Sequence, residues 1–244
     1  MKKALLLACM ISLLTACSLP GKVQITEIPA SDPTVIPTET AVEIPTEIPT
    51  EIPTETPTSV PPTETPEPHS AVLVVYFSRT GEQSSVGVID KGNTEIVAEM
   101  IAEKTGADFF QILPEVDNYP MTYVALTEIA KREQDERARP AYAGEVKDLA
   151  GYETVFIGAP VWWNDWPMIM YTFFEQNAEA LAGKTLIPFN THDGSGLSGF
   201  DTKLAGTLPQ SNVSAGFAVL GREAQNSTEF IRLTVNNWLE GIGF

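Results

Sequence analysis

The chain has 244 residues, and its 15 Lys+Arg against 32 Asp+Glu give a formal net charge of −17 at pH 7. So acidic a chain argues against nucleic acid and against anionic membrane surfaces as direct partners. Its two cysteines are Cys9 and Cys17. If processing removes Cys9 and modifies Cys17, the mature fold has no disulfide, no thiolate metal site and no cysteine nucleophile.

Residues 1–17 have the pattern of a bacterial targeting segment. Lys2 and Lys3 precede an apolar run, 4–14, that is too short to span a bilayer but suits a signal-peptide core. Residues 14–17, Leu-Thr-Ala-Cys, resemble the lipobox of lipoproteins, which implies cleavage before Cys17 and lipidation of that residue. We therefore expect a protein on the extracytoplasmic face of the cell membrane, held there by its lipid alone. An ordinary secretory signal or a chance cysteine is the alternative.

Residues 18–70 form a predicted tether. A Glu-Ile-Pro-Thr unit repeats with a period of four, and its last copy is Glu-Thr-Pro-Thr at 55–58. Proline at every fourth position prevents a helix, and the repeated acidic side chains repel one another. At about 3.1 Å per residue, such a polyproline-II-like segment could extend roughly 150 Å.

Residues 71–244 have the length of one ordinary domain, and they carry 23 acidic and 12 basic residues. Apolar runs predict strands at 72–77, 109–113, 154–159, 185–189 and 213–220, although Gly216 weakens the last. Helices are predicted over 94–105 with Thr94 as its cap, 123–137 with Val124, Ile129 and Ala130 inward, 166–180, 197–208 and 227–239.

This alternation of strands and helices predicts an α/β domain, with a parallel sheet covered by helices on both faces. In such sheets ligands bind beyond the carboxyl ends of the strands, where the strand order reverses. The loops 78–93, 160–165 and 191–196 are therefore the candidate site.

The first of these loops suits a phosphate at a helix N-terminus. It lacks both GxxxxGK[ST] and GxGxxG, so neutral donors and the helix dipole would hold the anion. Arg79 either pairs with the phosphate or faces solvent, and solvent is the favoured alternative. The candidate residues are Ser78, Arg79, Thr80, Gly81, Asn93 and Thr94.

The second loop places three tryptophans within five positions. Flat apolar rings are suitable walls for a flat aromatic cofactor, and we assign that role to at least one of Trp162 and Trp163. Trp166 is expected to pack under the following helix instead. The candidate residues here are Pro160, Val161, Trp162 and Trp163.

The third loop contains glycines that let the backbone approach a ring edge, and His192, the only histidine of residues 71–244. A structural or exposed role is more common for such a histidine than proton transfer. One histidine without cysteines does not make a zinc or iron site, and Ser195 in Gly-Ser-Gly makes a hydrolase a weak hypothesis. The candidate residues are Thr191, His192, Gly194, Ser195 and Gly196.

Together, YFSRTG with GNTEIVAEMIAEKTGAD, GAPVWWNDWP and NTHDGSG resemble the flavodoxin family over nearly all of residues 71–244. The resemblance implies a doubly wound five-stranded parallel sheet of order 2-1-3-4-5 that binds FMN noncovalently. The phosphate would lie at Ser78, Thr80, Gly81, Asn93 and Thr94, and the ring between 160–163 and 191–196. Residues 82–91 depart from the family pattern, and they either loop outward or fill the site.

The leading hypothesis is an FMN protein that moves electrons between an unidentified donor and acceptor, without a catalytic side chain of its own. An FMN-dependent reductase acting on quinones or other small oxidants is a close variant. The alternative from another class is a binding or scaffold module that keeps this fold without the cofactor.

Overall fold

A computed structural model describes residues 71–244. The predictions for the signal segment, Cys17 and the tether lie outside the described residues. Within 71–244, no helix combines the length and the apolar character needed to cross a bilayer.

The central sheet confirms the predicted fold class. Its parallel strands are ordered β4-β1-β6-β7, and the short strands β8 and β9 both pair with β7. If these parallel strands are renumbered along the chain, with β8 and β9 counted as one strand, their order in the sheet is 2-1-3-4-5. The strands are β1 (Val72–Phe77), β4 (Asp108–Pro114), β6 (Thr154–Pro160), β7 (Thr185–His192), β8 (Asn212–Val213) and β9 (Phe217–Leu220). A short edge strand that was not predicted, β5 (Tyr142–Ala143), runs antiparallel to β4.

The predicted fifth strand is interrupted near Gly216. β8 pairs with Thr185 and Leu186, and β9 pairs with 189–192, so the ladder is interrupted opposite Pro188. Proline has no N–H to donate, and a Cβ on Gly216 would lie 2.8 Å from the Pro188 carbonyl oxygen. The two chain segments therefore touch at this point without pairing.

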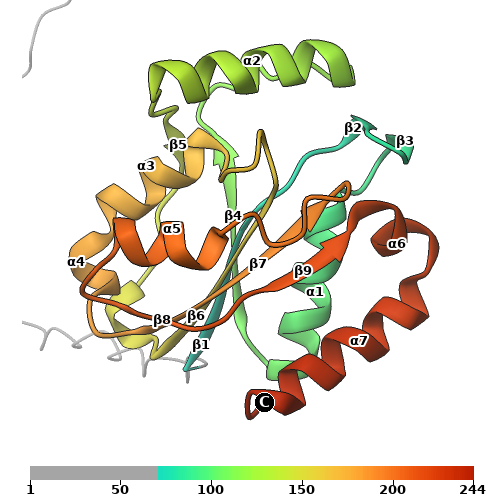
Figure 1. Cartoon of the computed structure of the whole chain (residues 1–244). Coiled ribbons are helices and arrows are strands. Elements are labelled where there is room, and N and C mark those ends of the chain that lie inside the picture. The colour runs from blue at the N-terminus through green and yellow to red at the C-terminus, as the bar shows by residue number, and fades with distance from the viewer. Residues whose placement is uncertain (1–70) are drawn as a thin grey trace, which may run out of the picture. The chain divides into compact units, whose positions relative to one another are not determined.

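Helices cover both faces of the sheet (Figure 1). Alternate residues of β1 belong to two apolar cores: Val74 packs with residues of α1 and α7, whereas Val75 packs with residues of α3 and α5. This double burial explains the continuous apolar run of β1. The covering helices are α1 (Asn93–Thr105), α3 (Met168–Gln176), α4 (Ala178–Leu181), α5 (Phe200–Thr207), α6 (Gly221–Asn226) and α7 (Thr228–Gly241), with a 3-10 turn, η1, at Leu149–Gly151. The single helix predicted over 166–180, with a start near Pro167 as an alternative, is divided into α3 and α4, and α3 begins directly after Pro167.

α2 (Tyr123–Glu136) has nearly its predicted bounds but lies beyond the carboxyl ends of the strands (Figure 1). It buries only Leu126 and Ala130, and Val124, predicted to face the core, is 66% exposed. The helix therefore covers the end of the sheet where ligands are expected to bind.

Residues 81–91 form a β-hairpin at the same end of the sheet. β2 (Gly81–Gln83) pairs antiparallel with β3 (Gly87–Ile89), and the tip consists of residues 84–86. This segment neither loops outward nor fills the site, because it forms one wall of the pocket described next.

Candidate functional site

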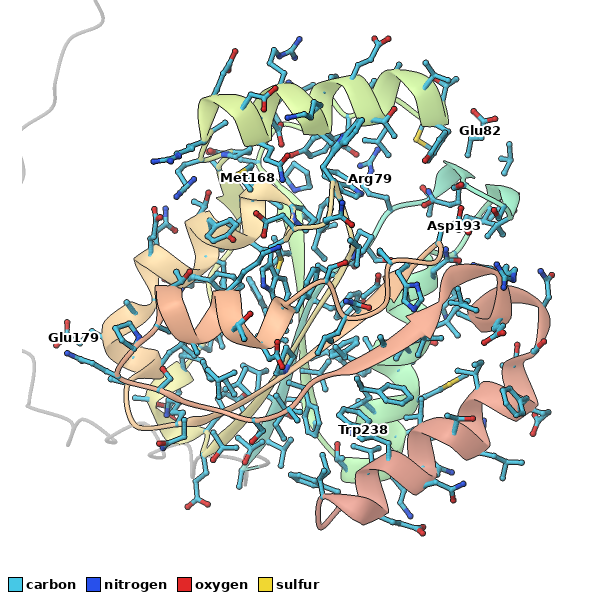
Figure 2. All side chains as sticks on the ribbon, viewed as in Figure 1. Arg79, Glu82, Met168, Glu179, Asp193 and Trp238 are labelled. Carbon is cyan, nitrogen blue, oxygen red and sulfur yellow. The ribbon has the colours of Figure 1, made fainter. Side chains whose placement is uncertain are left out.

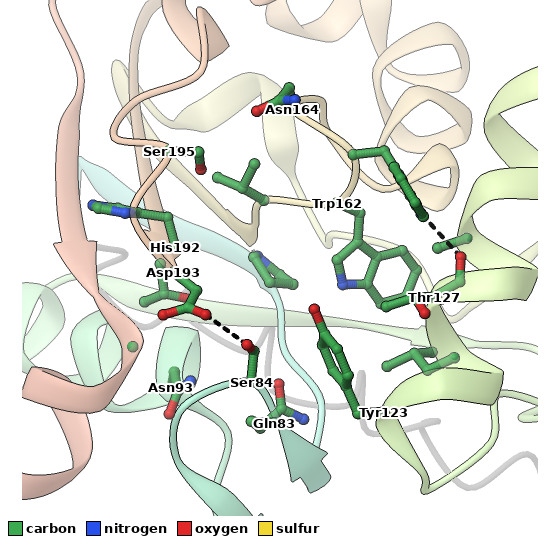
Figure 3. Close-up of a pocket in the computed structure, with 17 residues that line it drawn as sticks. Gln83, Ser84, Asn93, Tyr123, Thr127, Trp162, Asn164, His192, Asp193 and Ser195 are labelled. Carbon is green, nitrogen blue, oxygen red and sulfur yellow. Dashed lines mark hydrogen bonds between the residues drawn. The ribbon is translucent and has the colours of Figure 1, made fainter. Parts of the chain in front are cut away.

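A pocket of about 300 Å³ lies at the carboxyl ends of the central strands (Figure 3). It brings together eight of the predicted residues, from all three loops: Asn93, Pro160, Val161, Trp162, Trp163, Thr191, His192 and Ser195. Its other lining residues are Gln83, Ser84, Tyr123, Leu126, Thr127, Ala130, Asn164, Asp193 and Gly221. No lysine or arginine is among these lining residues, so any anion bound here would rely on neutral donors and the α1 dipole.

One end of the pocket is the N-terminus of α1. Gly92 is the N-cap, and the Ser78 hydroxyl accepts a hydrogen bond from the Glu95 amide at 3.1 Å. A Cβ on Gly92 would lie 2.0 Å from the Ser78 hydroxyl oxygen, so only glycine fits there. The Asn93 side-chain oxygen is buried and has no hydrogen-bond partner within the described residues. An amide oxygen accepts hydrogen bonds, so this group fits an anion at this end only with the Asn93 amide turned so that its N–H faces the ligand.

Thr94 was predicted to cap α1, and this is wrong. Its hydroxyl is buried and lies 2.7 Å from the hydroxyl of Thr191 at the end of β7. The pair joins the first and third predicted loops, and Thr191 itself lines the pocket. Ser78 accepts the Glu95 amide bond, and neither Ser78 nor Thr94 is among the lining residues.

Arg79 does not face the pocket. Its guanidinium donates to both oxygens of Asp117, at 2.8 and 2.7 Å, and to the Tyr119 carbonyl at 3.0 Å. Figure 2 shows it in the region below α2. The arginine side chain is 8% exposed, so both the phosphate role and the solvent-facing alternative are corrected: it holds the segment that precedes α2.

Thr80 and Gly81 also lie off the pocket lining. The Thr80 carbonyl accepts from the Gln83 amide group at 3.3 Å, and Gly81 has φ of 86° as the chain turns into the hairpin. Gly81 therefore forms the turn into the hairpin, and Gln83 lines the pocket in its place.

The tryptophan loop is a tight turn. Trp162 and Asp165 exchange both backbone hydrogen bonds at 3.0 Å, and Trp163 and Asn164 between them have φ of 50° and 57°. Two consecutive positive φ values define a type I′ turn, an unfavourable geometry for a tryptophan. The turn therefore directs two adjacent indoles in different directions.

Trp162 forms a wall of the pocket and is supported from behind. Its ring makes edge contacts with Phe77 and Tyr119, each at 5.4 Å between centroids. The Tyr119 hydroxyl donates to Glu133 at 3.0 Å, and burial raises the pKa of both groups, so the tyrosine stays protonated. This packing fixes the Trp162 ring as a rigid apolar surface.

The other two tryptophans differ in burial. Trp163 is 49% exposed, and its indole N–H donates to the Thr127 carbonyl of α2 at 2.9 Å. Trp166 is buried and stacks on Phe200 at 3.7 Å, which confirms its predicted core role.

His192 organises the third loop. Its Nδ1 accepts hydrogen bonds from the Gly194 and Gly196 amides, at 2.9 and 3.2 Å, so the proton of the neutral ring lies on Nε2. Burial lowers the pKa of His192, which favours that neutral form. The glycines thus orient the ring and do not line the pocket. Because Nδ1 is engaged by the backbone, His192 is poorly suited to activate Ser195, and the hydrolase hypothesis loses its base. Within residues 71–244, no group of three His, Cys, Asp or Glu side chains could hold a metal ion.

Sequence reasoning missed the lining residues contributed by α2 and the hairpin. The available signal was the short apolar stripe of the helix at 123–137, which is too narrow for a helix packed flat on a sheet. Leu126 and Ala130 are its buried positions, and Tyr123 and Thr127 join them in the pocket wall.

The fold and this pocket define a flavodoxin-like α/β protein with a ligand site at the strand-order reversal. The chain belongs to the flavodoxin family, whose sequence model matches residues 71–241. Among solved structures, a candidate flavoprotein from Bacteroides eggerthii is 29% identical, with a TM-score of 0.55 over 71% of this chain and 98% of that one. A similar protein from Bacteroides uniformis is 28% identical, with a TM-score of 0.54 over 71% and 99%. A Lactobacillus acidophilus flavoprotein in complex with FMN is 17% identical, with a TM-score of 0.49 over 64% and 96%. No curated protein matches the chain.

Proposed function

We propose that this protein binds FMN in the pocket and passes electrons between an external donor and an acceptor. Family membership supports a flavin, and one structural observation carries the assignment: Asn93, whose side-chain amide is not fully paired, lines a pocket that combines the N-terminus of α1 with an apolar indole wall. At about 300 Å³ the pocket is at the lower end of small-molecule sites, which span about 300–1,000 Å³.

The residues present fit this cofactor by their chemistry. The first-turn amides of α1 have no carbonyl partners within the helix, so those of Asn93 and Thr94 could hold the phosphate, with the Asn93 amide turned to donate. Trp162 would contact the ring, and Asp193 and Ser195 of the third loop would lie near the ring edge. When bound, the flavin supplies the redox chemistry.

The protein's own contribution is positioning and electrostatics. The domain carries 23 acidic against 12 basic residues, and a negative surround disfavours a reduced flavin that carries negative charge. We therefore expect a lowered midpoint potential. The same field favours docking of a basic electron donor and does not hinder encounter with neutral oxidants.

We further propose that the domain is anchored to the extracytoplasmic face of the membrane through lipid on Cys17. The lipobox pattern of residues 14–17 supports this, and so does the tether composition of residues 18–70. In cells expressing the full chain, Cys17→Ser should move the protein from the membrane fraction to the soluble fraction. Retention of the variant in membranes would refute lipid anchoring.

The cofactor is tested by titrating the purified full chain with FMN while recording visible absorption and flavin fluorescence. We expect flavin bands with quenched fluorescence, and weaker binding in Trp162→Leu. Trp238→Leu is the matched control, because Trp238 stacks on Phe217 away from Asp193 and the pocket (Figure 2).

A wild-type protein that stays colourless with added FMN would overturn this proposal and favour the cofactor-free module. One contact fits that alternative: the Gln83 side chain lines the pocket and donates to the Thr80 carbonyl within the expected phosphate loop.

A further inference from the structure

The hairpin β2–β3 is inserted between the two halves of the loop that joins β1 to α1. Without residues 82–91, Gly81 would connect directly to Gly92. The insertion instead folds into a regular antiparallel pair whose tip reaches the pocket, where Gln83 and Ser84 form part of the lining.

One side of the hairpin is attached to the segment that begins α2. The Glu82 amide donates to the Met121 carbonyl at 2.8 Å, and the Glu82 carboxylate accepts from the Tyr123 amide at 2.8 Å. Tyr123 lines the pocket, so this attachment joins the hairpin to the wall that α2 provides.

The tip of the hairpin is attached to the opposite side of the pocket. The Ser84 and Ser85 hydroxyls both donate to one carboxylate oxygen of Asp193, at 2.5 and 2.9 Å. Asp193 follows β7, in the loop that His192 organises, and Figure 3 shows it facing Ser84. Hydrogen bonds to a carboxylate are stronger than those between neutral groups. The hairpin thus bridges α2 and the third loop across the pocket.

Little apolar burial holds the hairpin in this position. Ile89 is its one buried apolar side chain, and Val88 is 79% exposed. An element held mainly by polar contacts at its edge can open without unfolding the domain.

Resting on the proposed function, we propose that the hairpin is a selectivity gate over the flavin, latched by Ser84 and Ser85 on Asp193. It admits small planar oxidants of the quinone class and keeps protein electron acceptors away from the ring. In this reaction the reduced cofactor gives two electrons and two protons to the quinone, which leaves as the hydroquinone.

The test uses the full chain loaded with FMN and reduced with dithionite under nitrogen. Reoxidation by 1,4-benzoquinone and by ferric cytochrome c is followed in a stopped-flow spectrometer, and the ratio of the cytochrome rate to the quinone rate is the readout. We expect a low ratio in the wild type. The double variant Ser84→Ala/Ser85→Ala should raise it by about tenfold or more, the factor that one charge-assisted hydrogen bond contributes.

Ser214→Ala, between β8 and β9, is the matched control and should leave the ratio unchanged. A second variant that deletes 82–91 and joins Gly81 to Gly92 should raise the ratio further. If the deletion protein does not fold, the serine variant decides the question.

A wild type that reacts with cytochrome c as fast as with quinone would overturn the gate. So would a ratio that the serine variant leaves unchanged. In both cases an intact flavin spectrum shows that the proposed function survives, whereas the absence of that spectrum from the wild type ends both proposals.

Discussion

The hydroxyl pair Thr94–Thr191 allows a sharp test of how the first and third loops are joined. Both residues are buried, and their hydroxyl oxygens lie 2.7 Å apart. Thr94→Val keeps the shape of the side chain but leaves the Thr191 hydroxyl buried without this partner. An unsatisfied buried hydroxyl costs about 1–3 kcal/mol, whereas replacing both partners with apolar groups can be nearly neutral. At about 2–4 °C per kcal/mol for a domain of this size, we expect Thr94→Val to lower Tm by roughly 2–12 °C.

The assay is a double-mutant cycle measured by thermal and urea unfolding of the full chain. Thr94→Val/Thr191→Val should be more stable than Thr94→Val alone, which gives a coupling free energy of about 1 kcal/mol or more. Additive losses in the double variant would refute the argument, because they would mean that the two hydroxyls do not satisfy one another.

In the same assay, adding FMN at about 100 times its Kd should stabilise the wild type by about 2.7 kcal/mol.

Trp166→Ala should cost about 3–5 kcal/mol in urea unfolding, because it removes a buried ring stacked on Phe200; a loss below about 1 kcal/mol would contradict its core role. Arg79→Met should leave FMN affinity unchanged in a fluorescence titration, because the guanidinium is bound to Asp117 and not to the pocket; a large loss of affinity would restore the phosphate role. Burial lowers the pKa of His192, so the stability that its neutral ring contributes is present above about pH 6.5 and shrinks as the pH falls from there toward the lowered folded pKa. His192→Ala should remove this component from the pH dependence of urea unfolding, and an unchanged slope would count against it.

The strands could be predicted because their signals are local. A run such as 72–77 is apolar throughout because both faces of β1 are buried, and no other element is needed to see this. The break in the fifth strand was not predictable in the same way. It depends on Pro188, a residue of the neighbouring strand that comes opposite Gly216 only after the sheet has formed.

The candidate site shows the same division between local and long-range information. The three loops were identifiable because the topology places strand ends together, and eight of the predicted residues meet in one pocket. The roles of individual side chains were less accessible. Arg79 binds a carboxylate 38 positions away, and Thr94 binds a hydroxyl 97 positions away. Sequence patterns indicate which loops matter, whereas long-range hydrogen bonds decide which atoms remain free for a ligand.

The insertion at 82–91 leaves the helix start that follows it well formed. Gly92 still lies against Ser78, so closely that only glycine fits, and the Ser78 hydroxyl still caps the Glu95 amide at 3.1 Å. The two halves of the loop therefore meet at the base of the hairpin. For this reason a flavin site and a gate are compatible in one loop: the base keeps the first turn of α1 in place, and the tip is free to attach to Asp193.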